Sequence, residues 1–138
     1  MDNSPQRKRT GLPRTVWIPA VVCLSLAVGC GGPDGPQRYE LSGIVTHDGQ
    51  AIPAGEIAFE PDSSKGNKGP AAYAPIKAGS YATPSGKGTV GGPHVVRISG
   101  TDGKPSGESP LGQMLFPEYR TTADLPKQSA EQNFDVPK

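Results

Sequence analysis

Cysteine is almost missing from this sequence. The only two cysteines among its 138 residues are Cys23 and Cys30, both near the start. Residues 31–138 therefore have no disulfide framework and no thiolate ligands for a metal. We expect their stability to come from packing and hydrogen bonds.

Aromatic and apolar side chains are also scarce. Aromatic residues make up 6% of the chain and hydrophobic residues 33%, so the predicted core is thin. Glycine and proline are abundant, with 19 and 16 residues. This composition disfavours helices and suits short strands joined by many turns. The length is that of one ordinary domain, which buries a modest fraction of its surface and is marginally stable.

Positive charge is concentrated before residue 30. The first 29 residues carry four basic side chains and one acid, a net charge of +3: Arg7, Lys8, Arg9, Arg14 and Asp2. The remaining residues carry ten basic and twelve acidic side chains, a net charge of −2. They contain no basic stripe, which argues against nucleic acid as a partner.

The start of the chain has the pattern of a signal peptide. Residues 1–14 are polar and basic, and residues 16–29 (VWIPAVVCLSLAVG) are apolar and uncharged. This apolar run is shorter than the ~20 residues of a membrane-spanning helix. Pro19 also disfavours a regular membrane helix. We therefore predict a signal peptide over residues 1–29.

The run Leu26-Ala27-Val28-Gly29-Cys30 resembles a bacterial lipobox. The resemblance implies that the Cys30 thiol receives a diacylglyceryl group and that cleavage then falls between Gly29 and Cys30. It also implies that the new N-terminus is acylated, with chains such as palmitate. Several acyl chains on one residue give stable anchoring in membrane lipid. The alternative is a plain secretory signal or an uncleaved anchor, in which Cys30 is incidental.

Residues 30–38 are predicted to form a flexible tether. They are rich in glycine and proline and show no apolar periodicity. Gly31 is not the aspartate that marks inner-membrane retention in some bacteria, so we expect placement in the outer membrane. The domain itself is predicted over residues 39–138.

The domain opens with a strand, a tight turn and a second strand. Residues 39–46 alternate, with Tyr39, Leu41, Gly43 and Val45 on one face, which indicates a half-buried strand. Asp48-Gly49 is typical of a hairpin turn in which glycine adopts a positive φ. The next strand points Ile57 and Phe59 inward and ends at Pro61.

Five further strands are expected at 72–76, around 81, at 94–98, around 123–125 and around 134–136. Pro75 indicates an edge strand, residues 62–69 a mobile loop, and residues 101–113 a long irregular segment. Leu115 and Phe116 are expected to cover one end of the core. Seven short strands with turns at this spacing predict an all-β sandwich of two sheets with almost no helix.

The opening SGIVTHDGQAIPAGEIAFEP looks like that of the carboxypeptidase regulatory-like domains of bacterial lipoproteins. The matching positions are Gly43, Val45, Asp48, Gly49, Pro53, Gly55, Ile57, Phe59 and Pro61. Later parts of the pattern fit at 79–81, 92–98, 116–119 and 133–136, so the resemblance spans about residues 39–137. It implies a seven-stranded, Greek-key, transthyretin-like (prealbumin-like) β-sandwich that is usually non-catalytic. His94 stands where the family often has an aromatic residue.

No catalytic, cofactor-binding or metal-binding residue is predicted. His47 is interpreted as an exposed turn residue and His94 as a residue at the rim of the core; a shared metal site is the weaker alternative. Asp62, Asn67 and Asp102 lie in loops but lack the alternating acidic pattern of a calcium loop. Candidate nucleophiles such as Ser42, Ser99 and Ser109 are not placed in a strand–turn–helix elbow. Residues 119–121 resemble the Tyr-Arg tail of hydroxyisourate hydrolases, but seventeen residues follow and the other motifs are missing.

The sequence therefore favours a lipid-anchored cell-envelope protein with a non-catalytic structural or protein-interaction module. Its expected partners are membrane lipid through acylated Cys30, and envelope proteins or glycans. The alternative is a carbohydrate or small-ligand module, for which the stacking residues would be Tyr73, Tyr81 and Tyr119. A transthyretin-like hydrolase is the third hypothesis.

Cys30→Ala tests the lipidation hypothesis. Without the thiol no diacylglyceryl group is added, and the precursor should keep its leader. Immunoblotting and intact mass of the envelope fraction measure the size of the product. A Cys30→Ala protein that matures to the normal size would show that Cys30 is incidental, and Cys23→Ala is the matched control.

Overall fold

The computed structural model describes residue 11 and residues 35–138. The predicted signal peptide, the cleavage position Gly29, Cys30 and the first part of the tether lie outside the described residues. Strand makes up 50% of the structure and helix 3%, which confirms the all-β prediction. The elements are β1 Leu41–His47, β2 Gln50–Ala51, β3 Ala54–Pro61, the 3₁₀ helix η1 Ser63–Lys65, β4 Ala72–Lys77, β5 Ser80–Ala82, β6 Gly92–Thr101, β7 Tyr119–Leu125, β8 Ala130–Glu131 and β9 Phe134–Val136.

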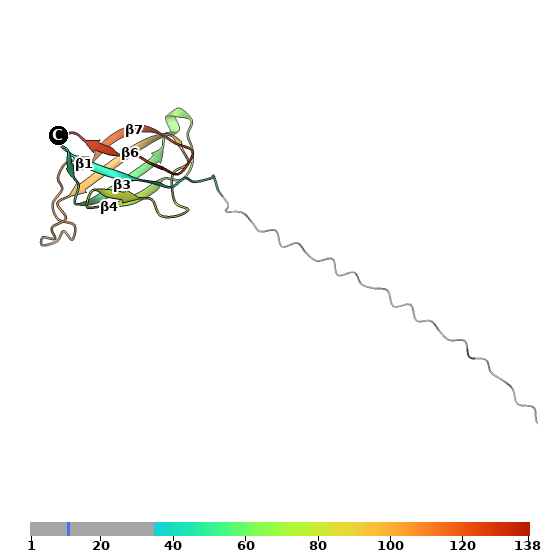
Figure 1. Cartoon of the computed structure of the whole chain (residues 1–138), viewed down its shortest axis with the longest axis horizontal. Helices are drawn as coiled ribbons and strands as arrows, with labels where there is room; N and C mark the ends of the chain where they lie inside the picture. Colours follow the sequence, from blue (N-terminus) through green and yellow to red (C-terminus); the bar gives the residue numbers. More distant parts are fainter. Residues whose placement is uncertain (1–10, 12–34) are drawn as a thin grey trace, which may run out of the picture. The chain divides into compact units, whose positions relative to one another are not determined.

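The strands form one curled sheet that is mostly antiparallel (Figure 1). Its order is β2-β1-β5-β4-β3-β6-β7, and β8 and β9 both pair in parallel with β1. All seven predicted strands are present. The described residues also contain β2 and β8, which are two residues long and which the sequence analysis did not predict.

The opening hairpin forms as predicted. Asp48 and Gly49 both have positive φ, 50° and 71°, which is the two-residue turn that matches the twist of a hairpin. The turn pairs His47 with Gln50, and Ile52 then enters the core fully buried. The opening of the domain therefore forms, in chain order, a strand, a hairpin turn and a buried core residue.

The core lies inside the curl. Fourteen buried residues contribute to it, with at least one from β1, β3, β4, β5, β6, β7 and β9. Phe59 is at its centre, 5.7 Å from the ring of Tyr81 and 6.0 Å from that of Phe134. Complete burial of a side chain such as that of Phe59 contributes about 2–3 kcal/mol to folding. The inward positions Ile57 and Phe59 are as predicted, and Phe116 covers one end.

β4 is not the edge strand that Pro75 indicated. It lies between β3 and β5, because Ile76 and Lys77 pair with β5. The N–H of Ala78 donates to the carbonyl of Pro53, which sets the alternation of the β3–β4 ladder. In that alternation the nitrogen of Pro75 points away from β3. The missing N–H therefore removes no bond from the β3–β4 ladder, and the β4–β5 ladder, which pairs Ile76 and Lys77, ends beside Pro75.

Residues 62–69 have more regular local structure than the predicted loop. They include η1, which Asp62 caps by accepting a hydrogen bond from the N–H of Ser64. The short helix ends at Gly66, whose φ of 76° lies in the left-handed region. Leu115 also departs from the prediction, because it is 41% exposed and does not cover the core.

Tyr81 links β5 to the end of the chain. Its side chain is 3% exposed, and its hydroxyl donates to the carbonyl of Gln132 at 2.7 Å. Burial raises the pKa of the Tyr81 hydroxyl well above its usual range, and the charge of Glu131 adds to this. The folded state therefore holds this hydroxyl protonated at pH values where the unfolded chain ionises.

Tyr81→Phe should lower the free energy of unfolding by about 1 kcal/mol at pH 7, because one buried hydrogen bond is lost. The stability that Tyr81 contributes is fully present below the pKa of its hydroxyl in the unfolded chain, which is about 10. It falls as the pH rises above that value. The wild type should therefore lose more stability than Tyr81→Phe between about pH 9 and 11. Urea unfolding followed by circular dichroism measures both, with the exposed Tyr73→Phe as control. Equal losses for all three proteins would contradict the prediction.

Candidate functional site

The three tyrosines proposed for ligand stacking do not form one surface. Tyr73 is 49% exposed on the outer face of β4, whereas Tyr81 is buried in the core and its hydroxyl is used by Gln132. Tyr119 is half-buried and packs against the core at the start of β7. The ring of Tyr81 therefore has no exposed face for a ligand to stack on, and the three rings have no common platform.

His94 lies in the core and not at its rim. It is 1% exposed and sits between Pro61 of β3 and Ala123 of β7 in the ladder. Its Nδ1 is 2.8 Å from the carbonyl oxygen of Gly92. A carbonyl only accepts, so this contact assigns the proton to Nδ1. Nε2 then has a lone pair, and no partner for it exists among the described residues.

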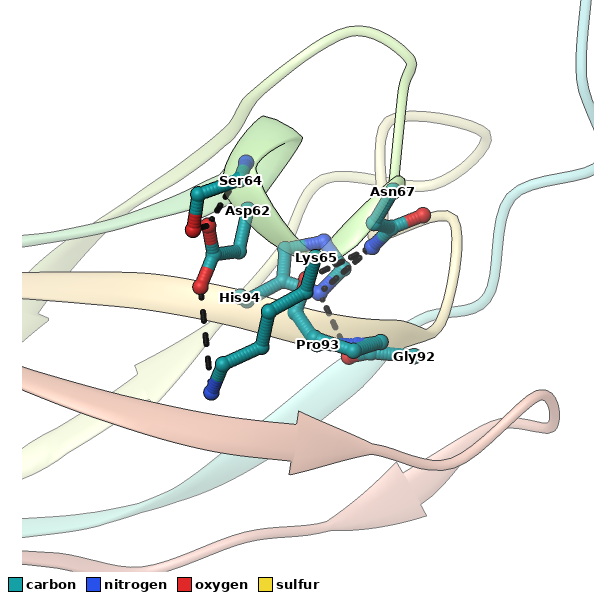
Figure 2. A network of polar contacts seen from close by, with 7 residues as sticks. All are labelled: Asp62, Ser64, Lys65, Asn67, Gly92, Pro93 and His94. Atoms are coloured by element: carbon teal, nitrogen blue, oxygen red, sulfur yellow. Dashed lines mark hydrogen bonds and ion pairs between the residues drawn. The ribbon is translucent and has the colours of Figure 1, made fainter.

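Asn67 holds the loop after β3 against the start of β6 (Figure 2). Its Nδ2 donates to the carbonyl of Pro93 at 2.7 Å and to that of Gly91 at 3.0 Å. The same atom lies 3.5 Å from Nδ1 of His94. Because Nδ1 carries a proton, this last approach is a contact and not a donated bond. Asn67 thus satisfies carbonyls directly beside the buried histidine.

Asp62 organises the other side of this network (Figure 2). It is 8% exposed, and its carboxylate accepts from both the hydroxyl and the N–H of Ser64. Lys65 approaches the second oxygen at 3.8 Å. Hydrogen bonds from Ser64 hold the pKa of Asp62 below its usual range, although its burial opposes this. The carboxylate is therefore occupied as a helix cap.

The two histidines do not share a metal site. His47 is half-buried, with its ring 4.6 Å from that of Phe116 and its Nδ1 3.2 Å from the carbonyl oxygen of Val136. Phe116 lies against Gly100, near the end of β6 opposite to His94. No group of three or more His, Cys, Asp or Glu side chains that could hold a metal occurs within the described residues. Of the residues considered for calcium, Asp102 directly follows the last residue of β6. Asp62 lies at the other end of this strand, where its N–H bonds to the carbonyl of Pro93.

The loop over residues 102–118, here called the tip loop, exposes three apolar side chains. Leu111 is 56% exposed, Met114 65% and Leu115 41%. The base of the loop is fixed: the carboxylate of Asp102 accepts from the N–H groups of Lys104 and Gln113, each at 3.0 Å. Phe116, in the same loop, is buried in the core. The loop therefore presents apolar atoms to solvent from an ordered base.

The tip loop lies at the end of the domain opposite to the point where the chain enters (Figure 1). At the first end, the guanidinium of Arg38 donates to the carbonyls of Gly88, Ala71 and Lys87. β1 starts there at Leu41 and ends at His47, which stacks on Phe116 under the tip loop. Seven strand residues span about 20 Å. The tip loop and the point where the chain enters thus lie at opposite ends of the domain.

Sequence reasoning did not identify the exposed apolar side chains of the tip loop. It predicted an irregular segment over 101–113 and assigned Leu115 to the core. The available signal was the presence of Leu111 and Met114 in a segment otherwise rich in glycine, proline and serine. Apolar side chains in such a segment have no periodicity that would place them inside a sheet.

No family model, curated protein or solved structure matches this chain. In the part of the chain that the structure covers, no helix is long and apolar enough to cross a bilayer.

Asn67→Ala should lower the free energy of unfolding by about 1–2 kcal/mol, because the Gly91 carbonyl loses its donor and that of Pro93 keeps only Asp62. Lys65→Ala in the same loop is the control. It removes a long ion pair, at 3.8 Å, whose lysine is exposed, and should cost less than about 0.5 kcal/mol. Urea unfolding gives both values, and hydrogen exchange at residues 91–94 locates the effect. Equal costs for the two variants would contradict the role given to Asn67.

Proposed function

We propose that this chain is a lipid-anchored cell-envelope protein whose β domain is a non-catalytic protein-interaction module. The leader over 1–29 directs export, and acylated Cys30 holds the protein in the membrane, which we place in the outer membrane. The Gly/Pro tether gives the domain its reach. The partner is an envelope protein that contacts the tip loop.

The observation that carries this proposal is the position of the exposed apolar side chains. Leu111, Met114 and Leu115 lie within five residues of one another, on a loop opposite to the side from which the tether leaves. A protein held through its N-terminal side presents such a loop away from its anchor. Apolar atoms that gather on a surface mark contact sites for other proteins.

The finer fold belongs to the same proposal. We infer that the curled sheet is a transthyretin-like, Greek-key β-sandwich of the carboxypeptidase regulatory-like kind. Support comes from the roles of the matching positions: Asp48 and Gly49 make the hairpin turn, and Phe59 is at the centre of the core. A Cβ atom at Gly43 or Gly55 would overlap with the backbone carbonyl of Gln132 or Ser99. The pattern thus includes glycines where no other residue fits.

A carbohydrate-binding module has less support. Stacking on a sugar needs exposed aromatic rings in one surface, and of the three tyrosines proposed only Tyr73 is well exposed. The hydrolase hypothesis gains no support either, because Nε2 of His94 is buried and without a partner among the described residues.

Site-specific photocrosslinking in the native envelope tests the proposal. A photoreactive amino acid replaces Met114 in the tip loop or, as the matched control, Lys87 near the end where the chain enters. We expect one protein adduct from position 114 and not from position 87. Leu111→Ser with Leu115→Ser should lower its yield at least fivefold, roughly the loss from removing apolar anchors of an interface. Thermal unfolding should stay unchanged, because both side chains are exposed.

Two results would contradict the proposal. Adducts to lipid alone from position 114 would place the tip loop on the membrane. The same protein adduct from both positions, insensitive to Leu111→Ser and Leu115→Ser, would show that the tip loop is not the contact site.

A further inference from the structure

β7 ends the sheet with an open edge. It pairs only with β6, and no other backbone group within the described residues bonds to it. Its seven residues, YRTTADL, contain no proline, glycine or lysine. Exposed edges are normally protected by proline, by charged side chains (lysine above all), by bulges or by a covering segment, because they template the addition of another strand. The charged side chains of this edge, Arg120 and Asp124, are of opposite sign.

The hydrogen bonds of β6 determine which groups face the open edge. The N–H of Asp62 donates to the carbonyl of Pro93 at 2.9 Å, so Pro93 and, two residues on, Val95 turn their backbone groups toward β3. Thr122 lies opposite Val95 in β7. It therefore turns its own N–H and C=O away from β6, as do the residues two positions before and after it. Three residues thus offer free donors and acceptors in a row.

Those three residues are Arg120, Thr122 and Asp124, and their charges are symmetric about the centre. All three side chains are exposed. Arg120 lies opposite Arg97 of β6, whose guanidinium already binds Glu60 at 2.7 Å. Neither Arg120 nor Asp124 has an ion-pair partner among the described residues. Each is placed two residues from Thr122, on opposite sides.

We propose that β7 is a self-association edge, at which a second copy of this chain adds its own β7 in antiparallel orientation about a two-fold axis at Thr122. In this register Arg120 lies across from the partner's Asp124, and Asp124 across from the partner's Arg120. Thr122 faces its own counterpart. About six backbone hydrogen bonds and two cross-strand ion pairs then form, and the sheet continues through both copies. The inference is independent of the proposed tip-loop partner.

The register follows from the side chains. A shift by one residue would place the outer face of one strand beside the inner face of the other, where Tyr119 and Ala123 pack on the core. A shift by two residues in either direction would set one of the two charges across from the partner's Thr122 and leave both charges unpaired. The antiparallel pairing is isologous and closed, so it gives a dimer and not a fibre. A strand of another sequence would have no reason to match this symmetry.

Charge exchange at positions 120 and 124 tests the pairing. Arg120→Asp alone sets acids against acids across the axis, and Asp124→Arg alone sets bases against bases. Each should raise the dimer Kd at least about tenfold in sedimentation velocity of the full-length, detergent-solubilised protein. The double variant should dimerise like the wild type, because the opposite charges are again paired.

A mixture of the two single variants gives the sharpest result. In the proposed register every acid of one chain faces a base of the other, so differently tagged single variants should associate with each other but not with themselves. Glu56→Lys, an exposed charge change on β3 away from the edge, is the control and should leave the Kd unchanged. A wild type that stays monomeric, or a double variant as weak as the singles, would overturn the proposal.

A disulfide between the two copies of β7 tests the proposed register directly. Opposed Cα atoms in a hydrogen-bonded antiparallel pair are about 5.5 Å apart, a distance that a disulfide spans. Thr122→Cys should therefore yield an oxidised dimer, whereas Ser80→Cys, exposed on β5, should not. The unsubstituted chain controls for disulfides through Cys23 and Cys30. A Thr122→Cys disulfide with some other protein, and not with a second copy, would assign the edge to that partner and overturn the inference.

Discussion

Closure of the core depends on one carbonyl group, that of Gln132. It lies against Gly43 of β1, where a Cβ atom would overlap with it. It also accepts a hydrogen bond from the hydroxyl of Tyr81 in β5. The last segment of the chain can therefore fold over the inner side of the first strand. β8 and β9 pair with β1 on either side of this point. A methyl group at position 43 would push the carbonyl of Gln132 away from β1 at this point.

Polar side chains fix the loops at both ends of this cysteine-poor domain. At one end Asn67 binds the loop after β3 to the carbonyls of Gly91 and Pro93, and Asp62 caps the short helix within that loop. At the other end Asp102 accepts two N–H groups and closes the base of the tip loop. In each case a short side chain bonds to backbone groups that a strand cannot pair. These side-chain hydrogen bonds hold the loops at both ends of a thin core. The apolar side chains of the tip loop stay exposed to solvent.

Much of the fold could be predicted from local pattern, and the errors share one cause. The alternation in residues 39–46 and 94–98 and the Asp48-Gly49 turn identified strands and a hairpin correctly, because period and turn chemistry are local properties. β2 and β8 are too short for any period to show. Pro75 was interpreted from its own chemistry, but whether its missing N–H matters depends on which neighbouring strand its nitrogen faces. Tyr81 and His94 were placed near the surface because nothing local reveals which strand covers them.

The candidate sites were less predictable than the strands. The apolar residues of the tip loop have no period, and only the structure separates buried Phe116 from exposed Leu115. The symmetric charges of β7 are visible in the sequence, but they acquire meaning only once β7 is known to end the sheet. Each of these sites is a surface or an edge that no other part of the described chain covers. Which surfaces stay uncovered depends on the whole topology.

The parallel pairing of β1 with β9 also constrains the order of folding. The N–H of Ile44 bonds to the side chain of Asn133, 89 residues later, and Asp48 bonds to Val136. Contacts of such long sequence separation form slowly, because a long loop must close before they gain anything. During synthesis this pairing waits for nearly the last residues to leave the ribosome, although β1 can already pair with β2 and β5. The sheet of a chain with this topology is therefore complete only when almost the whole chain has been made.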